Sequence, residues 1–386
     1  MAAKSLRSES ELKVRVTYHP AADDYHNKHK EGDGMKRTAM ALAAMGLAAA
    51  GSASAQSNVT LYGLVDAGIE YVSHAGPDGS AVKLTSGGKN TSRWGIRGSE
   101  DLGGGLKAVF NLESGIAIDT GRLDTDNTLF DRRASVGLAS KYGQVVLGRT
   151  FTTTYDFMLP FDPMGYAPAY SWATSSTATG GRKDGLFSRA SNAIRYDGSF
   201  GGLKLGATMA LGEVAGDFKS SSRYALGAGY NAGKFAAAAT WDRQNGAGTS
   251  TTPADSTDYI QGIHAGASYD FGELKLFAGY RNYKRAFTTG AASDRSDMYW
   301  GGASYAFTPA FTLYGAVYKQ NIKGGNDADP ILFSLRGQYA LSKRTLAYLS
   351  VGYARARNGQ DVSVSRDLVG FANNQTGVMA GLQHRF

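Results

Sequence analysis

The chain has 386 residues, among them 51 Gly, 22 Tyr, 17 Phe, only 8 Pro and no Cys, and its formal net charge is +8. Without Cys, the chain can form no disulfides, no thiolate metal sites and no thiol nucleophile. The many glycines, set against a usual share of about 7%, combine with abundant aromatic residues. This composition is unusual for an α/β enzyme and favours strands joined by tight turns.

The first 55 residues have the pattern of an exported precursor. Met35-Lys36-Arg37 opens a basic segment, an apolar run starts at Ala39, and Ala53-Ser54-Ala55 forms a cleavage pattern before Gln56. A charged start, a short apolar stretch and a small-x-small end are typical of a signal peptide. We therefore interpret 35–55 as a signal peptide, 1–34 as an unstructured extension or start-site artefact, and 56–386 as the mature chain. Residues 1–55 hold eight basic and six acidic side chains, so cleavage would lower the net charge of +8 by two units.

After residue 56 the dominant pattern is alternation with a period of two. In segments 58–71, 92–100, 105–114 and 331–339, apolar side chains occupy one parity and polar or charged side chains the other. Such alternation predicts β-strands. The segments are about ten residues long, which suits a tilted strand across a bilayer better than the usual five or six residues. No apolar stretch is long enough for a membrane-spanning helix.

Short and long connections alternate along the same region. Seven very short connections lie at 102–105, 140–143, 200–202, 231–233, 270–272, 308–310 and 341–343. Longer polar stretches, predicted to be loops, include 75–88, 245–258 and 358–375. Seven short turns with strands on both sides give eight hairpins and sixteen strands, an outer-membrane barrel pattern. Because no backbone group can stay unpaired in hydrocarbon, the sheet must close. The predicted fold is an all-β, 16-stranded antiparallel transmembrane β-barrel with an aqueous channel.

Particular motifs carry a resemblance to a known family. LYGLVDAGIEY, SRWGIRGSEDLGGGLKAVFNLESG, RRASVGLASKYGQVVLGR and the terminal HRF are similar to the trimeric general porins of Gram-negative bacteria, most of all the β-proteobacterial type. The similarity covers essentially all of 56–386. It implies an outer-membrane general diffusion porin that passes small hydrophilic solutes and ions. It further implies a homotrimer in contact with outer-membrane lipid and lipopolysaccharide, with no cofactor.

One connection is much longer than the others. Residues 152–188, between LGRTF and SRASNAIRY, include three prolines and several aromatic residues. A loop of this length is commonly functional or disordered, and the aromatic residues argue against disorder. In the porins that the chain resembles, the third loop folds into the lumen and narrows the pore. Asp156 and Asp162 are the best acidic candidates on this loop, and Asp184 is a weaker one.

Arginines are the candidates for the opposite wall of the pore. The resemblance places wall arginines on the second, fifth and sixth strands, where Arg93, Arg149 and Arg189 match. Parity also supports Arg93 and Arg189, and it adds Arg133 as a fourth candidate. Arg149 has the parity of its apolar neighbours, so either a bulge precedes it or it lies above the membrane. Acids facing bases in a narrow channel focus the electric field, and the excess of bases predicts a mild anion preference.

The chain ends inside a predicted strand. Val378, Ala380, Leu382, His384 and Phe386 share one parity, so the terminal aromatic ring is expected to face lipid at a barrel rim. In a closed barrel the last strand pairs with the first, which explains an end inside the sheet. The resemblance implies that the assembly machinery of the outer membrane reads Phe386.

Two rival functions are an enzymatic barrel and a substrate-specific channel. His74, His264 and His384 are the only histidines of the mature chain, and none lies at a recognisable spacing from a nucleophile. We therefore expect no enzyme, and likewise no metal site. Without a run of five like charges, nucleic acid is not an expected partner. Tyr166, Tyr170 and Trp172 of the long loop leave the alternative of a substrate-specific channel open, and saturable conductance would distinguish it from a general pore.

Overall fold

The computed structural model describes residues 58–174, 184–246, 258–287, 294–323 and 327–386. All of them belong to one compact unit that begins at Ala55. The expected N-terminal extension and signal peptide lie outside the described residues and stay predictions. No helix in the described part of the chain is long and apolar enough to cross a membrane.

Almost all regular structure consists of strands. They are β1 (Asn58–Gly76), β2 (Gly79–Ser86), β3 (Arg93–Gly103), β4 (Leu106–Ala117), β5 (Arg122–Leu123), β6 (Arg133–Ser140), β7 (Gly143–Phe151), β8 (Arg189–Phe200), β9 (Leu203–Ala210), β10 (Arg223–Ala232), β11 (Phe235–Asn245), β12 (Tyr259–Asp270), β13 (Leu274–Ala286), β14 (Asp294–Ala306), β15 (Phe311–Lys323), β16 (Ile331–Ala340), β17 (Thr345–Arg355) and β18 (Asn374–Arg385). One α-helix, α2 (Thr153–Met158), is followed directly by the 3-10 helix η1 (Leu159–Phe161).

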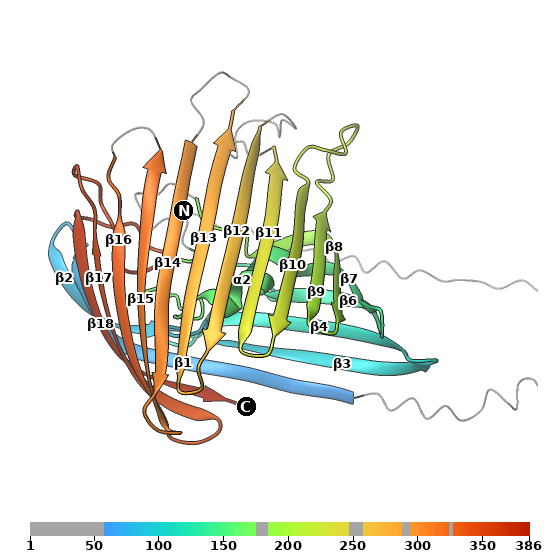
Figure 1. Ribbon diagram of the computed structural model, residues 1–386, viewed down its shortest axis with the longest axis horizontal. Coiled ribbons are helices and arrows are strands. Elements are labelled where there is room, and N and C mark those ends of the chain that lie inside the picture. Colours follow the sequence, from blue (N-terminus) through green and yellow to red (C-terminus); the bar gives the residue numbers. More distant parts are fainter. Residues whose placement is uncertain (1–57, 175–183, 247–257, 288–293, 324–326) are drawn as a thin grey trace, which may run out of the picture. The chain divides into compact units, whose positions relative to one another are not determined.

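The strands form one closed antiparallel sheet. From β6 to β18 each strand pairs with the next, β4 joins β6 to β3, and β3 pairs with β1 (Figure 1). The ring closes where β1 pairs with β18, from Leu64 opposite Arg385 to Val72 opposite Gly377. The last residue continues this seam, because Phe386 N–H donates to the Gly63 carbonyl and Gly63 N–H donates back, each over 3.1 Å. The predicted pairing of first and last strands is confirmed.

The second barrel strand is interrupted. Along β1, residues 58–64 pair with β3, whereas residues 67–76 pair with β2. β2 and β3 are therefore two parts of one strand, and β5 is a two-residue pairing with β4 alone. Within the described residues this leaves the sixteen barrel strands that the turn pattern predicted.

The prediction of a long loop at 75–88 is wrong. This stretch makes a tight turn at 77–78 and then strand β2. Val82 and Leu84 are 72% and 57% exposed on the outer face, so the alternation continues here. The glycines, Pro77 and Asp78 suggested a loop, but they occupy only the turn and its edges.

The sheet carries apolar side chains on its exposed outer face and polar side chains on its buried inner face, which is the opposite of the arrangement in a soluble protein. On β1, Val59, Leu61 and Ile69 are each 61% exposed, while Asp66 and Glu70 are 0% and 3% exposed. Soluble domains seldom expose wide apolar surfaces, but a barrel in lipid has an apolar band outside and a polar interior. The predicted parity of apolar and polar side chains is confirmed.

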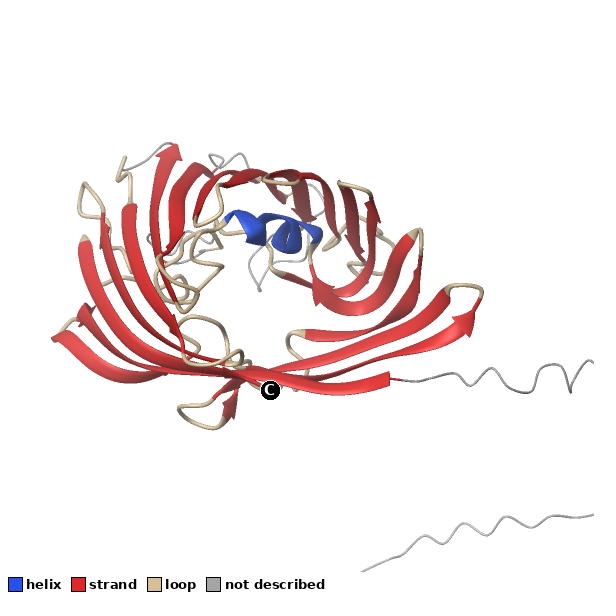
Figure 2. Cartoon of the chain, turned by 60° about the horizontal axis from the view of Figure 1, so that its bottom comes forward, coloured by secondary structure: helices blue, strands red, loops and turns tan. Residues whose placement is uncertain are grey.

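The long loop packs against the polar-parity face of the sheet. Figure 2 shows α2 within the ring of strands. Glycines on the strands accommodate the loop's rings: a Cβ added to Gly206 would lie 2.7 Å from Phe157, one on Gly266 2.6 Å from Phe161, and one on Gly377 2.6 Å from Tyr170. β9, β12 and β18 each carry one of these glycines.

Most of the buried apolar side chains lie between this loop and the sheet. The largest cluster combines Met158, Phe161, Tyr170 and Trp172 of the loop with inward residues of β14 to β18 such as Tyr318. The loop therefore supplies much of the apolar packing of the protein.

Candidate channel constriction

The neck of the long loop is closed by Thr152. Its N–H donates to the Ser188 carbonyl over 3.0 Å and its hydroxyl donates to the Phe187 carbonyl, so the two ends of the loop are joined. The same hydroxyl accepts from Tyr155 N–H over 3.2 Å and caps α2. This fixes α2 directly at the end of β7, and the first turn of α2 carries Asp156.

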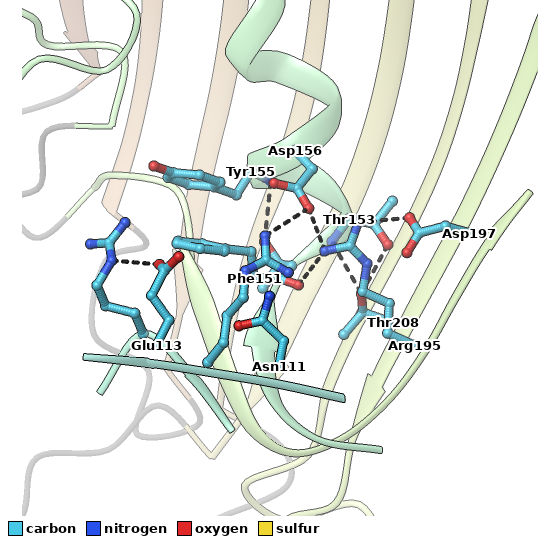
Figure 3. Close-up of polar contacts among 12 residues, drawn as sticks. Asn111, Glu113, Phe151, Thr153, Tyr155, Asp156, Arg195, Asp197 and Thr208 are labelled. Atoms are coloured by element: carbon cyan, nitrogen blue, oxygen red, sulfur yellow. Dashed lines mark hydrogen bonds and ion pairs between the residues drawn. The ribbon is translucent and has the colours of Figure 1, made fainter. Parts of the chain in front are cut away.

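Asp156 faces basic side chains of the sheet. Its Oδ2 lies 2.6 Å from a guanidinium nitrogen of Arg195 on β8 and 4.0 Å from one of Arg133 on β6 (Figure 3). Arg195 also binds Asp197, over 2.6 Å, and the Phe151 carbonyl, over 2.6 Å. Arg195 is 4% exposed, whereas Arg133 is half-buried. The Asp156 carboxylate therefore lies between a buried guanidinium group and a partly accessible one.

The guanidinium groups of three arginines lie against the Phe151 ring. The guanidinium carbons of Arg133, Arg189 and Arg132 lie 4.6, 5.1 and 5.4 Å from its centroid. Tyr155 stacks on the same ring at 4.5 Å. Cation–π attraction of this kind holds several like charges close together without neutralising them.

Glu113 balances part of this charge from β4. Its Oε1 accepts from Arg132 over 2.7 Å, Oε2 lies 3.9 Å from Arg93, and Tyr62 donates to Oε2 over 2.8 Å. The carboxylate is thus engaged by Arg132 and Tyr62 and attracts Arg93, which itself donates to the Thr91 carbonyl over 3.0 Å.

Two hollows meet at these residues. The first, of about 630 Å³, is lined among others by Arg93, Arg133 and Arg189, and the second, of about 400 Å³, by Arg195. Arg133 and Asp156 line both. The lining of the first includes five arginines (Arg93, Arg132, Arg133, Arg189 and Arg366) and four carboxylates (Glu113, Asp124, Asp156 and Asp367), an excess of one positive charge.

The three acids considered on the loop have different environments. Only Asp156 lies at the hollows. Asp162 is 4% exposed and accepts from the N–H groups of Met164 and Tyr166, over 3.2 and 2.7 Å, and from the Tyr318 hydroxyl. Asp162 therefore fixes the loop's own backbone to β15 and does not face the arginines, contrary to the sequence expectation.

Asp184 has a similar anchoring position. It is fully buried and accepts from the Ser296 hydroxyl over 2.8 Å and from the Gln320 side-chain amide. The return arm of the loop is thereby attached to β14 and β15.

Arg149 is held by hydrogen bonds outside the two hollows. It donates to the Asp131 carbonyl and, over 2.7 Å, to the Ser191 hydroxyl, and it is not among the residues that line the two hollows. The pairing of β7 with β8 shifts register between Gly148 and Thr150. This irregularity matches one of the two explanations considered for its parity, a bulge, but it does not bring Arg149 to the hollows.

Sequence reasoning missed four residues of the site. Arg195 has inward parity between Ile194 and Tyr196, so parity alone could have found it. Arg132 and Glu113 meet only through the pairing of β4 with the start of β6. Arg366 comes from the loop 356–373, for which the sequence contains no signal.

Tyr170 and Lys89 are among the groups outside the strands whose pKa values are shifted. Burial, and secondarily the charge of Glu70, raises the pKa of Tyr170 far above its usual value, so its hydroxyl stays a donor to Glu70 over 3.1 Å. Burial, followed by the positive charge of Arg336, lowers the pKa of Lys89 in the connection 87–92 to about 7. Arg93 acts in the same direction on Lys89. No group of three or more His, Asp or Glu residues in the described ranges could hold a metal ion.

A closed barrel with an apolar outer band and charged internal hollows defines a membrane channel protein. The sequence matches the Gram-negative porin family over residues 39–359. It is 33% identical to outer membrane porin protein 32 of Delftia acidovorans, over 91% of this chain and all of that protein. It is 30% identical to an outer membrane porin of Bordetella pertussis, with the same coverage.

A solved structure gives the same result. The anion-selective porin from Comamonas acidovorans is 28% identical and superposes with a TM-score of 0.72, over 86% of this chain and all of that one. The chain belongs to the Gram-negative porin family, and it is an outer-membrane β-barrel protein.

Proposed function

We propose that the protein is a general diffusion porin with a mild preference for anions, in which the loop 152–188 forms the constriction. The observation that carries this proposal concerns Arg133 and Asp156, each of which lines both hollows. A guanidinium nitrogen of Arg133 lies 4.0 Å from a carboxylate oxygen of Asp156. A solute passing from one hollow to the other would pass beside the guanidinium group of Arg133 and the carboxylate of Asp156.

Arg93, Arg133 and Arg189 form the basic wall in this proposal, together with Arg195, and Asp156 forms the acidic side. Asp162 and Arg149 are not included, because each is engaged elsewhere. A transverse field between fixed charges orients polar solutes and slows apolar ones, because a low-dielectric surround focuses the field.

The anion preference is supported by charge. The first hollow has one more arginine than carboxylates, and its arginines cluster around Phe151. The solved relative from Comamonas acidovorans is described as anion-selective. No nucleophile and base are needed for passive diffusion, so the proposal includes no catalysis.

Reversal potentials in planar bilayers test this function. With a KCl gradient across the bilayer, we expect a potential of the sign that chloride permeation produces, and a conductance that increases linearly with salt. A potential of the opposite sign would contradict the anion preference. Conductance that saturates and is competed by one solute would favour a substrate-specific channel, for which Tyr166, which lines the first hollow, is the candidate contact.

Assembly is the remaining part of the proposal. We expect residues 35–55 to be removed on export, and the mature chain to form homotrimers inserted by the barrel-assembly machinery through its last strand. The position of Phe386 at the seam with β1 supports a role of this strand in closure. Unboiled electrophoresis tests the oligomer, since a band no larger than a monomer would contradict a stable trimer.

A further inference from the structure

The loop 356–373, between β17 and β18, is paired with the long loop through its backbone. Ala169 and Ser365 form an isolated antiparallel bridge. On either side of it, Tyr170 N–H donates to the Val364 carbonyl over 3.2 Å and Arg366 N–H donates to the Pro168 carbonyl over 3.1 Å. Two loops that are far apart in the sequence therefore share a short piece of sheet.

Side chains reinforce this pairing. Val362 and Val364 are both 0% exposed and belong to the same apolar cluster as Trp172. Trp172 Nε1 donates to the Ser363 carbonyl over 2.9 Å. The loop 356–373 thus buries two valines against the long loop, which a loosely attached surface loop would not do.

The part of the long loop that contacts the loop 356–373 has an unusual backbone conformation. Tyr166 and Tyr170 have φ angles of 58° and 67°, a left-handed conformation that is uncommon outside glycine. Arg366 donates to the Tyr166 carbonyl over 2.7 Å and to the Thr174 hydroxyl over 3.3 Å. Strained residues of this kind persist where surrounding contacts hold them. Arg366 and the Val364 carbonyl supply two of these contacts, in addition to Asp162 at the Tyr166 N–H and Glu70 at the Tyr170 hydroxyl.

The same arginine reaches the channel. Arg366 and Asp367 line the first hollow, together with Arg133 and Arg189. The Asp367 carboxylate lies 3.1 Å from Arg366 but is 65% exposed, so water screens this pair strongly. Arg366 is one of the five arginines that line this hollow, so its replacement by a neutral residue would remove one positive charge from the lining.

We propose that the segment 362–367 is a second wall of the constriction, and that Arg366 is a selectivity-determining residue which also positions the loop 152–188. This inference rests on the proposed channel function for its electrical part. The pairing of the two loops can be tested independently of that function.

A disulfide tests the pairing. Ala169 and Ser365 are a pair without direct hydrogen bonds, since the flanking residues make them, and such pairs have Cα atoms about 4.5 Å apart, within disulfide range. The chain has no Cys, so the double variant Ala169→Cys, Ser365→Cys contains only this pair. We expect a loss of two mass units and protection from thiol labelling in outer membranes. The two single variants are the controls, and free thiols in the folded double variant would overturn the pairing.

Reversal potentials test the charge. Arg366→Gln should reduce the anion-to-cation permeability ratio at about 0.1 M salt and have much less effect at about 1 M, where the Debye length falls from about 10 to about 3 Å. Arg366→Lys should retain the ratio. Arg357→Gln is the matched control, because this arginine of the same loop lines a different hollow, with Lys319 and Asp329.

The outcomes separate the two hypotheses. A wild-type channel without anion preference would contradict the proposed function and leave the disulfide result to decide the pairing. An anion-selective wild type with an unchanged Arg366→Gln ratio would overturn the selectivity role. A change of equal size at both salt concentrations would also overturn it, because a purely positional effect is not screened.

Discussion

The glycines beneath the long loop allow a quantitative test of how this loop is held. Gly266 on β12 faces Phe161, and a Cβ at this position would lie 2.6 Å from Cδ2 and Cγ of Phe161 and 2.7 Å from its Cβ. Gly301 on β14 is a matched control, because an added Cβ would meet nothing nearer than 3.7 Å. We compare Gly266→Ala with Gly301→Ala.

The expected cost follows from these distances. Ordinary contacts begin at 3.4 Å, so Phe161 must move by about 1 Å to accept the new methyl group. Its Cβ is attached to the backbone, so the movement includes the loop and cannot be absorbed by a side-chain rotation alone. Overpacking of this kind costs about 1–3 kcal/mol, which changes the ratio of seated to displaced loop by about 5- to 150-fold.

Single-channel recording and thermal unfolding measure the effect. For Gly266→Ala we expect additional conductance levels, because the loop leaves its position more often, and unfolding of the barrel at a lower temperature. Gly301→Ala should match the wild type in both. If Gly266→Ala also matches the wild type in both measurements, the loop is not held by the contact of Phe161 with the sheet and the reasoning fails.

Three further predictions follow from the charges and the seam. Asp156→Asn should raise the anion-to-cation permeability ratio by about 1.5- to 5-fold, as a partly solvated charge contributes about 0.2–1 kcal/mol; an unchanged reversal potential would place Asp156 outside the ion path. The pKa of Lys89 is lowered to about 7, so this side chain is positively charged below pH 7 and neutral above it. The anion preference should therefore decrease as the pH is raised from 6 to 8. Lys89→Gln should remove this pH dependence, and Lys141→Gln, in the exposed turn between β6 and β7, should retain it; a dependence that survives in Lys89→Gln would assign it to another group. Deletion of Phe386 removes the two hydrogen bonds to Gly63 and should lower the yield of heat-modifiable barrel more than the conductance of channels that do insert, so a normal yield would argue against its role in assembly.

The sequence was sufficient for the barrel because the barrel follows from local rules. Alternation and turn length are local properties, and they predicted the seven short turns and the sixteen strands. The error at 75–88 came from reading Pro77 and the glycines as a loop, although Val82 and Leu84 continued the alternation. A tight hairpin and a long loop begin with the same residue types, and only the residues that follow distinguish them.

The site was less accessible because it depends on partners far away in the sequence. Asp156 and Asp162 are alike in sequence, but Asp162 is taken up by Tyr318 and by the backbone of its own loop. Arg149 follows Gly148, where the pairing with β8 changes register, and alternation cannot reveal such a shift. Arg366 depends on the pairing of two loops, which no periodicity predicts.

The seam between β1 and β18 is the pairing that closes the barrel, so the barrel is complete only when β18 is in place. Leu64 pairs with Arg385, so residues of the first and last strands are neighbours in the sheet. Until β18 is present, β1 and the most recently added strand each have an unpaired edge, and hydrocarbon offers no water to satisfy it. We therefore expect a chain truncated before β18 to have no stable state in the membrane, so that insertion would depend on the final strand.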